Sequence, residues 1–158
     1  MQKHTLFTIL LVSAPATAFA GGSAGSIGVG AEISTLGARD LSVNYDAGAF
    51  HVGGAFGFED DRPGGFQNNF RIGGRFYYHL HSTALADFGL GGEVHVEDAE
   101  GDNNTAVEIA GGFQIRSFIS TNVALSFTGG FVIGTADSDG ISISGTALGA
   151  AGFHYYFF

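Results

Sequence analysis

The chain has 158 residues, including 27 glycines, 16 phenylalanines and no cysteine, and its formal net charge is −9. The lack of cysteine excludes disulfides and thiolate metal sites. An acidic chain without a basic patch is also a poor match for nucleic acid, so we expect no nucleic-acid partner.

The first 20 residues, MQKHTLFTILLVSAPATAFA, have the pattern of a secretory signal peptide. A basic start precedes an apolar run over 6–12, and Ala18-Phe19-Ala20 forms an A-x-A cleavage site. The run is shorter than the about 20 residues of a membrane-spanning helix. We therefore expect 1–20 to be removed and 21–158 to form one exported domain, with five arginines against fifteen acidic residues.

Apolar residues alternate with small or polar ones throughout residues 21–158, which is the period of a β-strand. Seven turn-like stretches separate eight predicted strands, and every second connection is very short. This pattern predicts an all-β fold, an eight-stranded antiparallel up-and-down transmembrane β-barrel. The predicted strands cover 26–34, 41–46, 49–58, 69–81, 85–97, 105–118, 122–135 and 141–157.

The two faces of the predicted strands differ in charge. One face is apolar and carries no charged residue, whereas the other combines charges with many Gly, Ala and Ser residues. Small residues suit a narrow lumen, and lysine, the usual solvating residue, is absent after Lys3. Aromatic residues gather at both ends of the apolar face, as in membrane barrels. The alternative is a soluble exported lipocalin-like barrel with the apolar face inside.

The chain closes on GFHYYFF, residues 152–158, with aromatics alternating along the last strand. With the signal peptide and eight alternating strands, this ending resembles the small OmpA/OmpX-like outer-membrane barrels of Gram-negative bacteria. The resemblance implies that Phe153, Tyr155, Phe157 and Phe158 form the signal read by the barrel-assembly machinery, with Phe157 as its key aromatic. It also implies a monomer in the cell outer membrane, in contact with membrane lipid and lipopolysaccharide.

The inward face offers one constellation of charges, which we expect to form a lumenal network because an unpaired buried charge is costly. A register summing to 203 sets Asp87 opposite Arg116 and His95 opposite Glu108. A register summing to 168 sets Arg75 opposite Glu93 and Arg71 opposite Glu97. The predicted network comprises Glu32, Arg71, Arg75, Asp87, Glu93, Glu97, Glu108 and Arg116.

Five histidines are also predicted to face the lumen: His51, His79, His81, His95 and His154. Protonated histidines would offset the excess of lumenal carboxylates, so acidity would alter the lumen; the simpler interpretation is that they fill space and form hydrogen bonds. The spacing of His79 and His81 suits a metal, but no third ligand is assured. We therefore predict neither a metal nor a cofactor.

Three acidic stretches, at 59–61, 98–102 and 137–140, are expected to share one rim as solvated outer loops. None has the full calcium-loop pattern. The chain also lacks the serine or histidine constellation of barrel enzymes near the outer rim, so catalysis is not predicted.

The predicted function is therefore that of an integral outer-membrane barrel with a structural or interaction role and a lumen filled by polar side chains. The alternative is a narrow porin-like channel for ions or small solutes. That alternative depends on inward glycines leaving room for water: Gly53, Gly73, Gly89, Gly91, Gly112 and Gly130.

Overall fold

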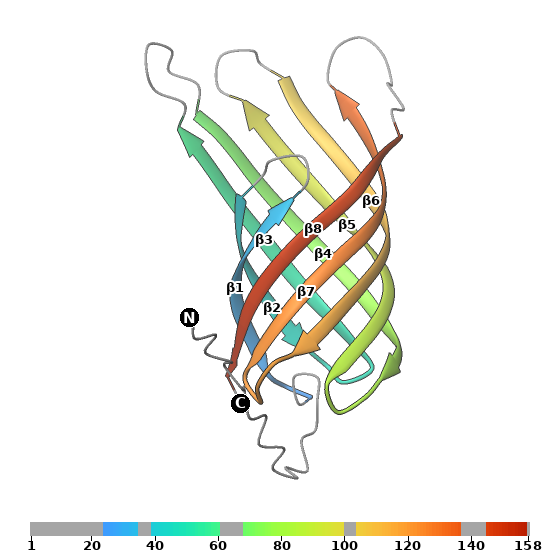
Figure 1. Ribbon diagram of the computed structural model, residues 1–158. Coiled ribbons are helices and arrows are strands. Elements are labelled where there is room, and N and C mark those ends of the chain that lie inside the picture. The colour runs from blue at the N-terminus through green and yellow to red at the C-terminus, as the bar shows by residue number, and fades with distance from the viewer. Residues whose placement is uncertain (1–23, 35–38, 61–67, 100–103, 137–144, 158) are drawn as a thin grey trace, which may run out of the picture.

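A computed structural model describes residues 24–34, 39–60, 68–99, 104–136 and 145–157. Each strand pairs antiparallel with the next, and β8 returns to pair with β1, so the sheet closes into a barrel (Figure 1). In these ranges, no helix is long and apolar enough to cross a membrane. The strands are β1 (Ile27–Ser34), β2 (Arg39–Asp46), β3 (Phe50–Asp60), β4 (Asn68–Ser82), β5 (Ala86–Ala99), β6 (Asn104–Phe118), β7 (Val123–Ala136) and β8 (Gly145–Phe157).

The predicted eight-stranded antiparallel barrel is confirmed, and strand bounds agree within two residues for β1 to β7. The expected start of the last strand, at 141–144, and the expected signal peptide, at 1–20, lie outside the described residues. One boundary matters for the lumen: β2 begins at Arg39, so Asp40 belongs to a strand and not to a turn. Both predicted registers between β4, β5 and β6 are also confirmed.

The two ends of the barrel differ in their connections, and Figure 1 shows them at opposite ends of the cylinder. We call the end with the short connections 47–49, 83–85 and 119–122 the turn rim, and the opposite end the loop rim. Side chains stabilise the short turns: the Gly48 amide donates to Asp46 Oδ1 at 2.8 Å, and Gly48 has a positive φ of 85°. Residues 59–60 and 98–99 of the acidic stretches end β3 and β5 at the loop rim, and the rest of these stretches lies outside the described residues.

The alternation of each strand sorts apolar from polar side chains between the outer surface and the lumen. Large apolar residues are exposed on the outside, with Leu41 66% and Phe131 76% exposed, whereas Arg116 is 1% exposed inside. Phe153, Tyr155 and Phe157 belong to the exposed outer face and sit on β8 where it pairs with β1, as predicted. Phe158 lies outside the described residues. The polarity of this barrel is therefore inverted relative to that of a water-soluble one.

The alternation breaks near the turn rim of β4. The pairing of β4 with β5 shifts between His79 and His81, so that His79 pairs with Gly89 and His81 pairs with Phe88 of the outer face. His81 is exposed. The prediction that His81 faces the lumen is therefore wrong, because a bulge adds one residue to the strand and reverses the side on which the next residue lies.

Candidate functional site

The lumen of the barrel is the candidate functional site, because it holds most of the buried charged and polar side chains. Three arginines occupy it at different depths. Arg116 lies near the turn rim, Arg75 lies in the middle of β4, and Arg71 lies toward the loop rim. Each arginine contacts side chains on strands that are not its neighbours in the sheet, and Arg116 on β6 reaches Asp46 on β2, the opposite strand of the barrel.

Arg116 is the centre of the cluster at the turn rim. Its Nη2 lies 2.7 Å from Asp46 Oδ2, 2.7 Å from Asp87 Oδ2 and 3.0 Å from His79 Nε2. Its Nη1 donates to the Tyr156 hydroxyl at 3.1 Å. The guanidinium also lies over the rings of Phe118, at 5.6 Å, and Tyr156, at 6.0 Å. One buried cation thus links β2, β4, β5 and β8 to β6.

Two histidines extend this cluster, and their partners determine which ring nitrogen carries the proton. His79 Nδ1 lies 2.7 Å from the Gly48 carbonyl, which only accepts, so Nδ1 donates. His79 Nε2 faces the Arg116 guanidinium, which only donates, so Nε2 accepts. His51 Nδ1 lies 2.8 Å from the same Nε2, so its N–H shares the single lone pair of that nitrogen with Arg116. The two histidines connect the turn at 47–49 to the buried arginine.

Arg75 forms the central ion pair of the lumen. It binds Glu32 through two contacts, 2.6 Å from Nη2 to Oε1 and 2.7 Å from Nη1 to Oε2. Only the contact of Nη1 with Oε2 is a hydrogen bond; it is charge-assisted, and such bonds are stronger than those between neutral groups. His154 Nε2 lies 3.0 Å from Glu32 Oε1 and 2.6 Å from Ser42 Oγ. β1 and β4 are not adjacent in the sheet, so this pair spans the barrel.

The third cluster begins near the centre and extends toward the loop rim. The Tyr77 hydroxyl donates to Glu93 Oε1 at 2.8 Å, and His95 Nε2 lies 2.9 Å from Glu93 Oε2. Arg71 then contacts His95 Nδ1 at 3.4 Å and Glu108 Oε2 at 3.3 Å. Because Arg71 can only donate to His95 Nδ1, Nε2 carries the proton and donates to Glu93.

The predicted charged residues do meet in the lumen, but only one of the arginines has the carboxylate partner that the hairpin registers predicted. Arg116 contacts Asp87 as expected, but the carboxylate partners of Arg75 and Arg71 are Glu32 on β1 and Glu108 on β6, strands that do not pair with β4. Glu93 and Glu97 lie opposite these arginines in the register without forming their ion pairs. Within the described ranges, Glu97 has no ion pair. Opposite Cα positions were therefore a poor guide to the partners of long side chains.

Several lumenal residues were not predicted as part of the network. Asp40 is buried toward the loop rim, and its Oδ1 lies where a side chain on Gly57 would be. Tyr77, Phe118 and Tyr156 are buried beside the charged groups. Asp40 lay just before the predicted strand 41–46. Because β2 begins two residues earlier, at Arg39, Asp40 belongs to the strand and takes an inward position. The buried aromatics carried no signal beyond their inward position in the alternation.

At most of the inward glycines named for the channel alternative, a Cβ would meet close neighbours. A Cβ at Gly53 would meet Asn44 Oδ1 and Arg75 Nε, and one at Gly73 would meet the His95 ring. At Gly91, Gly112 and Gly130 a Cβ would meet the backbone of the adjacent strand. The position that a side chain would occupy at these glycines is therefore taken by neighbouring side chains or by the backbone of the adjacent strand.

One group of lumenal side chains has the composition of a cation site. Among the described residues, the ligand atoms of Asp46, His79 and Asp87 lie within 4.8 Å of one another. The Arg116 Nη2 contacts all three of these side chains. This nitrogen has two hydrogens for three acceptors. The guanidinium thus occupies the position that a bound cation would take.

No protein-family model and no curated protein sequence matches the chain. Among solved structures, the chain is similar to Neisserial surface protein A, NspA, at 16% sequence identity. The alignment covers 84% of this chain and 94% of that chain, with a TM-score of 0.48.

Proposed function

We propose that the chain is an integral outer-membrane β-barrel with a structural or interaction role, and that side chains close its lumen. The observation that carries the proposal is the inverted polarity of the barrel. Its outer surface exposes apolar side chains from every strand, whereas the charged side chains that the structure describes lie inside, apart from Arg39. In water such a surface would be a large aggregation liability, whereas in a lipid bilayer it is the expected one.

The closed sheet also supports a lipid bilayer as the environment of the barrel. In the hydrocarbon core of a bilayer each unpaired backbone group is costly, and a closed barrel leaves no unpaired sheet edge. Here β8 pairs with β1 over eight residue pairs, from Ile27–Phe157 to Ser34–Ala150. A soluble lipocalin-like barrel would also be closed, but it would place the apolar face inside.

Insertion into phospholipid vesicles tests whether the barrel is a membrane protein. Refolded protein added to phospholipid vesicles is expected to float with the vesicles, to resist extraction at alkaline pH, and to migrate differently on electrophoresis with and without heating. A chain that remains monomeric and soluble without detergent or lipid would instead support the soluble alternative.

Conductance tests the closed lumen. The three arginine clusters cross the lumen, and the inward glycines are covered, so we expect no large steady current through the wild-type barrel in a planar bilayer. A variant that removes the central pair, Arg75→Ala with Glu32→Ala, is the matched comparison. Steady current through the wild-type barrel would support the porin-like alternative.

The remaining parts of the proposal follow from the resemblance to OmpA/OmpX-like barrels. They are the assembly role of Phe153, Tyr155, Phe157 and Phe158, a monomeric state, and contact with lipopolysaccharide. We propose no catalytic role and no cofactor. An altered lipid A mass spectrum after deletion of the gene would contradict the absence of catalysis.

A further inference from the structure

We infer that the outer surface of β1 to β4 carries a binding site for a phosphate-bearing membrane lipid, with Arg39 holding the headgroup and an adjacent groove holding an acyl chain. This inference depends on the proposed membrane location and adds a specific ligand to it. It is carried by one cation on the outer face and by two contiguous hollows.

Arg39 differs in charge from the other outer-face side chains that the structure describes. It is exposed, and it pairs with Ile33, whose side chain is 62% exposed on the outer face. Among the outward side chains that the structure describes, Arg39 alone belongs to a lysine, arginine, aspartate or glutamate residue. In the same ranges it has no carboxylate partner. Two described acids beside it belong to the inward positions: Asp40 is buried, and Glu32 binds Arg75.

The position of Arg39 along the barrel matches that of a lipid headgroup. β2 has eight residues, fewer than the about 9–11 that cross a hydrocarbon core, and β1 is equally short. Figure 1 shows that these two strands end well below β3 to β6 at the loop rim. Arg39 is the first residue of β2 at that rim. The exposed rings of Phe56 and Phe58 line the same hollow, as aromatics of a membrane interface do.

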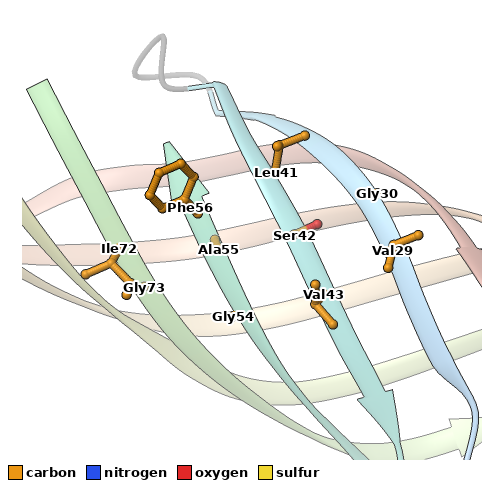
Figure 2. A pocket seen from close by; sticks show the side chains of 10 residues that line it. All are labelled: Val29, Gly30, Leu41, Ser42, Val43, Gly54, Ala55, Phe56, Ile72 and Gly73. Carbon is orange, nitrogen blue, oxygen red and sulfur yellow. The ribbon is translucent and has the colours of Figure 1, made fainter. Parts of the chain in front are cut away.

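Two hollows run from this arginine down the outer surface. The upper one, of about 370 Å³, is lined by Arg39 and by residues that include Ile33, Leu41 and Phe58. The lower one, of about 510 Å³, shares Leu41 and Phe56 with it, so the two are contiguous. Figure 2 shows Val29, Leu41, Val43, Phe56 and Ile72 around Gly54, which has no side chain to fill the centre. A charged upper end and an apolar lower end match the two parts of a lipid.

Phosphate is the anion that this arrangement favours. A guanidinium presents several donors in a plane and binds phosphate oxygens through paired contacts. Phosphate is also the common anionic group of membrane lipids, and one arginine near the membrane surface contributes about 1 kcal/mol, or about a fivefold gain in affinity. Two acidic residues, Asp40 and Glu32, line the upper hollow as well. Glu32 is paired with Arg75, so the carboxylate that weakens this attraction most is that of Asp40.

The test compares four forms of the full chain: wild type, Arg39→Gln, Gly54→Leu and Gly111→Leu. A side chain at Gly54 fills the lower hollow, and its Cβ would have its nearest contact at 3.6 Å, so little strain is expected. Gly111 is also on the outer face, and a Cβ there meets nothing within 4 Å, but it lies on β6 away from the hollows. It is therefore the matched control. Each form is first shown to insert into vesicles.

Native mass spectrometry then measures retention of dioleoyl phosphatidic acid, dioleoylglycerol and inorganic phosphate in detergent micelles. We expect the wild type to retain phosphatidic acid about fivefold better than dioleoylglycerol, and Arg39→Gln to abolish that preference. Gly54→Leu should weaken retention of both lipids, whereas Gly111→Leu should match the wild type.

Three results would overturn the inference: equal retention by Arg39→Gln and wild type, equal effects of the two leucine variants, or binding of inorganic phosphate as tight as that of the lipid. Failure of the wild type to insert would instead contradict the proposed membrane location. Insertion without any preference for phosphatidic acid would contradict only the lipid site.

Discussion

Arg116 contacts lumenal side chains on four other strands, through Asp46, His79, Asp87 and Tyr156. It neutralises Asp46 and Asp87, which are 1% and 3% exposed, and it donates to Tyr156. Asp46 also accepts from the Gly48 amide, so the same carboxylate fixes the turn and binds the arginine. A single charge therefore couples a turn at the rim to the packing of the interior.

Replacing Arg116 with methionine should destabilise the barrel by about 3–5 kcal/mol, because two carboxylates would remain buried without their cation. The measurement is thermal unfolding in detergent, followed by the loss of β-sheet circular dichroism. The triple variant Arg116→Met, Asp46→Asn, Asp87→Asn is the control, and it should regain part of the loss because no buried charge is left unpaired. Equal stability of the single and triple variants would show that charge pairing is not the cause.

The same substitution should create a divalent cation site. With the guanidinium gone, Asp46, His79 and Asp87 offer three ligand atoms within 4.8 Å, and carboxylate with imidazole is a common zinc donor set. Zinc ions should raise the melting temperature of Arg116→Met and leave that of the wild type unchanged. Adding His79→Phe to the variant should remove the effect; if zinc still stabilises that form, the ion binds elsewhere.

At the level of the strand, glycines show how closely neighbouring elements approach. Gly111 and Gly112 are consecutive on β6 and lie on opposite faces. A Cβ at Gly112 would meet the Gly129 carbonyl, with the Gly130 Cα 2.7 Å away, whereas a Cβ at Gly111 meets nothing within 4 Å. The inner surface of β6 is therefore packed against the β7 backbone, which a side chain cannot easily displace.

Gly112→Ala should destabilise the barrel by about 1–3 kcal/mol through this overpacking. Gly111→Ala should be neutral or should stabilise it by about 0.5–1 kcal/mol, because alanine restricts the unfolded chain more than glycine does. Parallel unfolding of both variants in urea, in the same detergent, gives the comparison. If the two variants unfold at the same urea concentration, the close approach of β6 and β7 is not limiting.

The strands and two of their registers were predictable because alternation is a local signal. Each apolar position fixes the face of its neighbours, and a short turn fixes which residues lie opposite one another. The bulge before His81 and the start of β2 at Arg39 were not predictable, since neither changes the local composition. The lumenal partners of Arg75 and Arg71 were also missed, because hairpin pairing relates only adjacent strands while these side chains reach beyond the adjacent strand.

Closure is a property of the whole molecule, because it joins the first strand to the last. The contacts of Glu32 on β1 with His154 on β8 and with Arg75 on β4 depend on that closure, since an open sheet would separate its edge strands. The register between β1 and β8 therefore determines which residues meet in the lumen. It is the one pairing that no hairpin turn fixes.

A disulfide tests this closure directly, because the chain has no cysteine of its own. Ala31 and Phe153 are register partners on the outer face, so Ala31→Cys with Phe153→Cys should cross-link on mild oxidation and change the electrophoretic mobility. Opposite Cβ atoms in antiparallel strands are about 4.5–5.5 Å apart, near the about 3.5–4.5 Å of a disulfide. The control, Ala31→Cys with Tyr155→Cys, places the thiols diagonally at about 7–8 Å and should cross-link poorly. Efficient cross-linking of the control pair alone would mean that β8 is shifted by two residues against β1, and the Glu32 contacts would then have to be different.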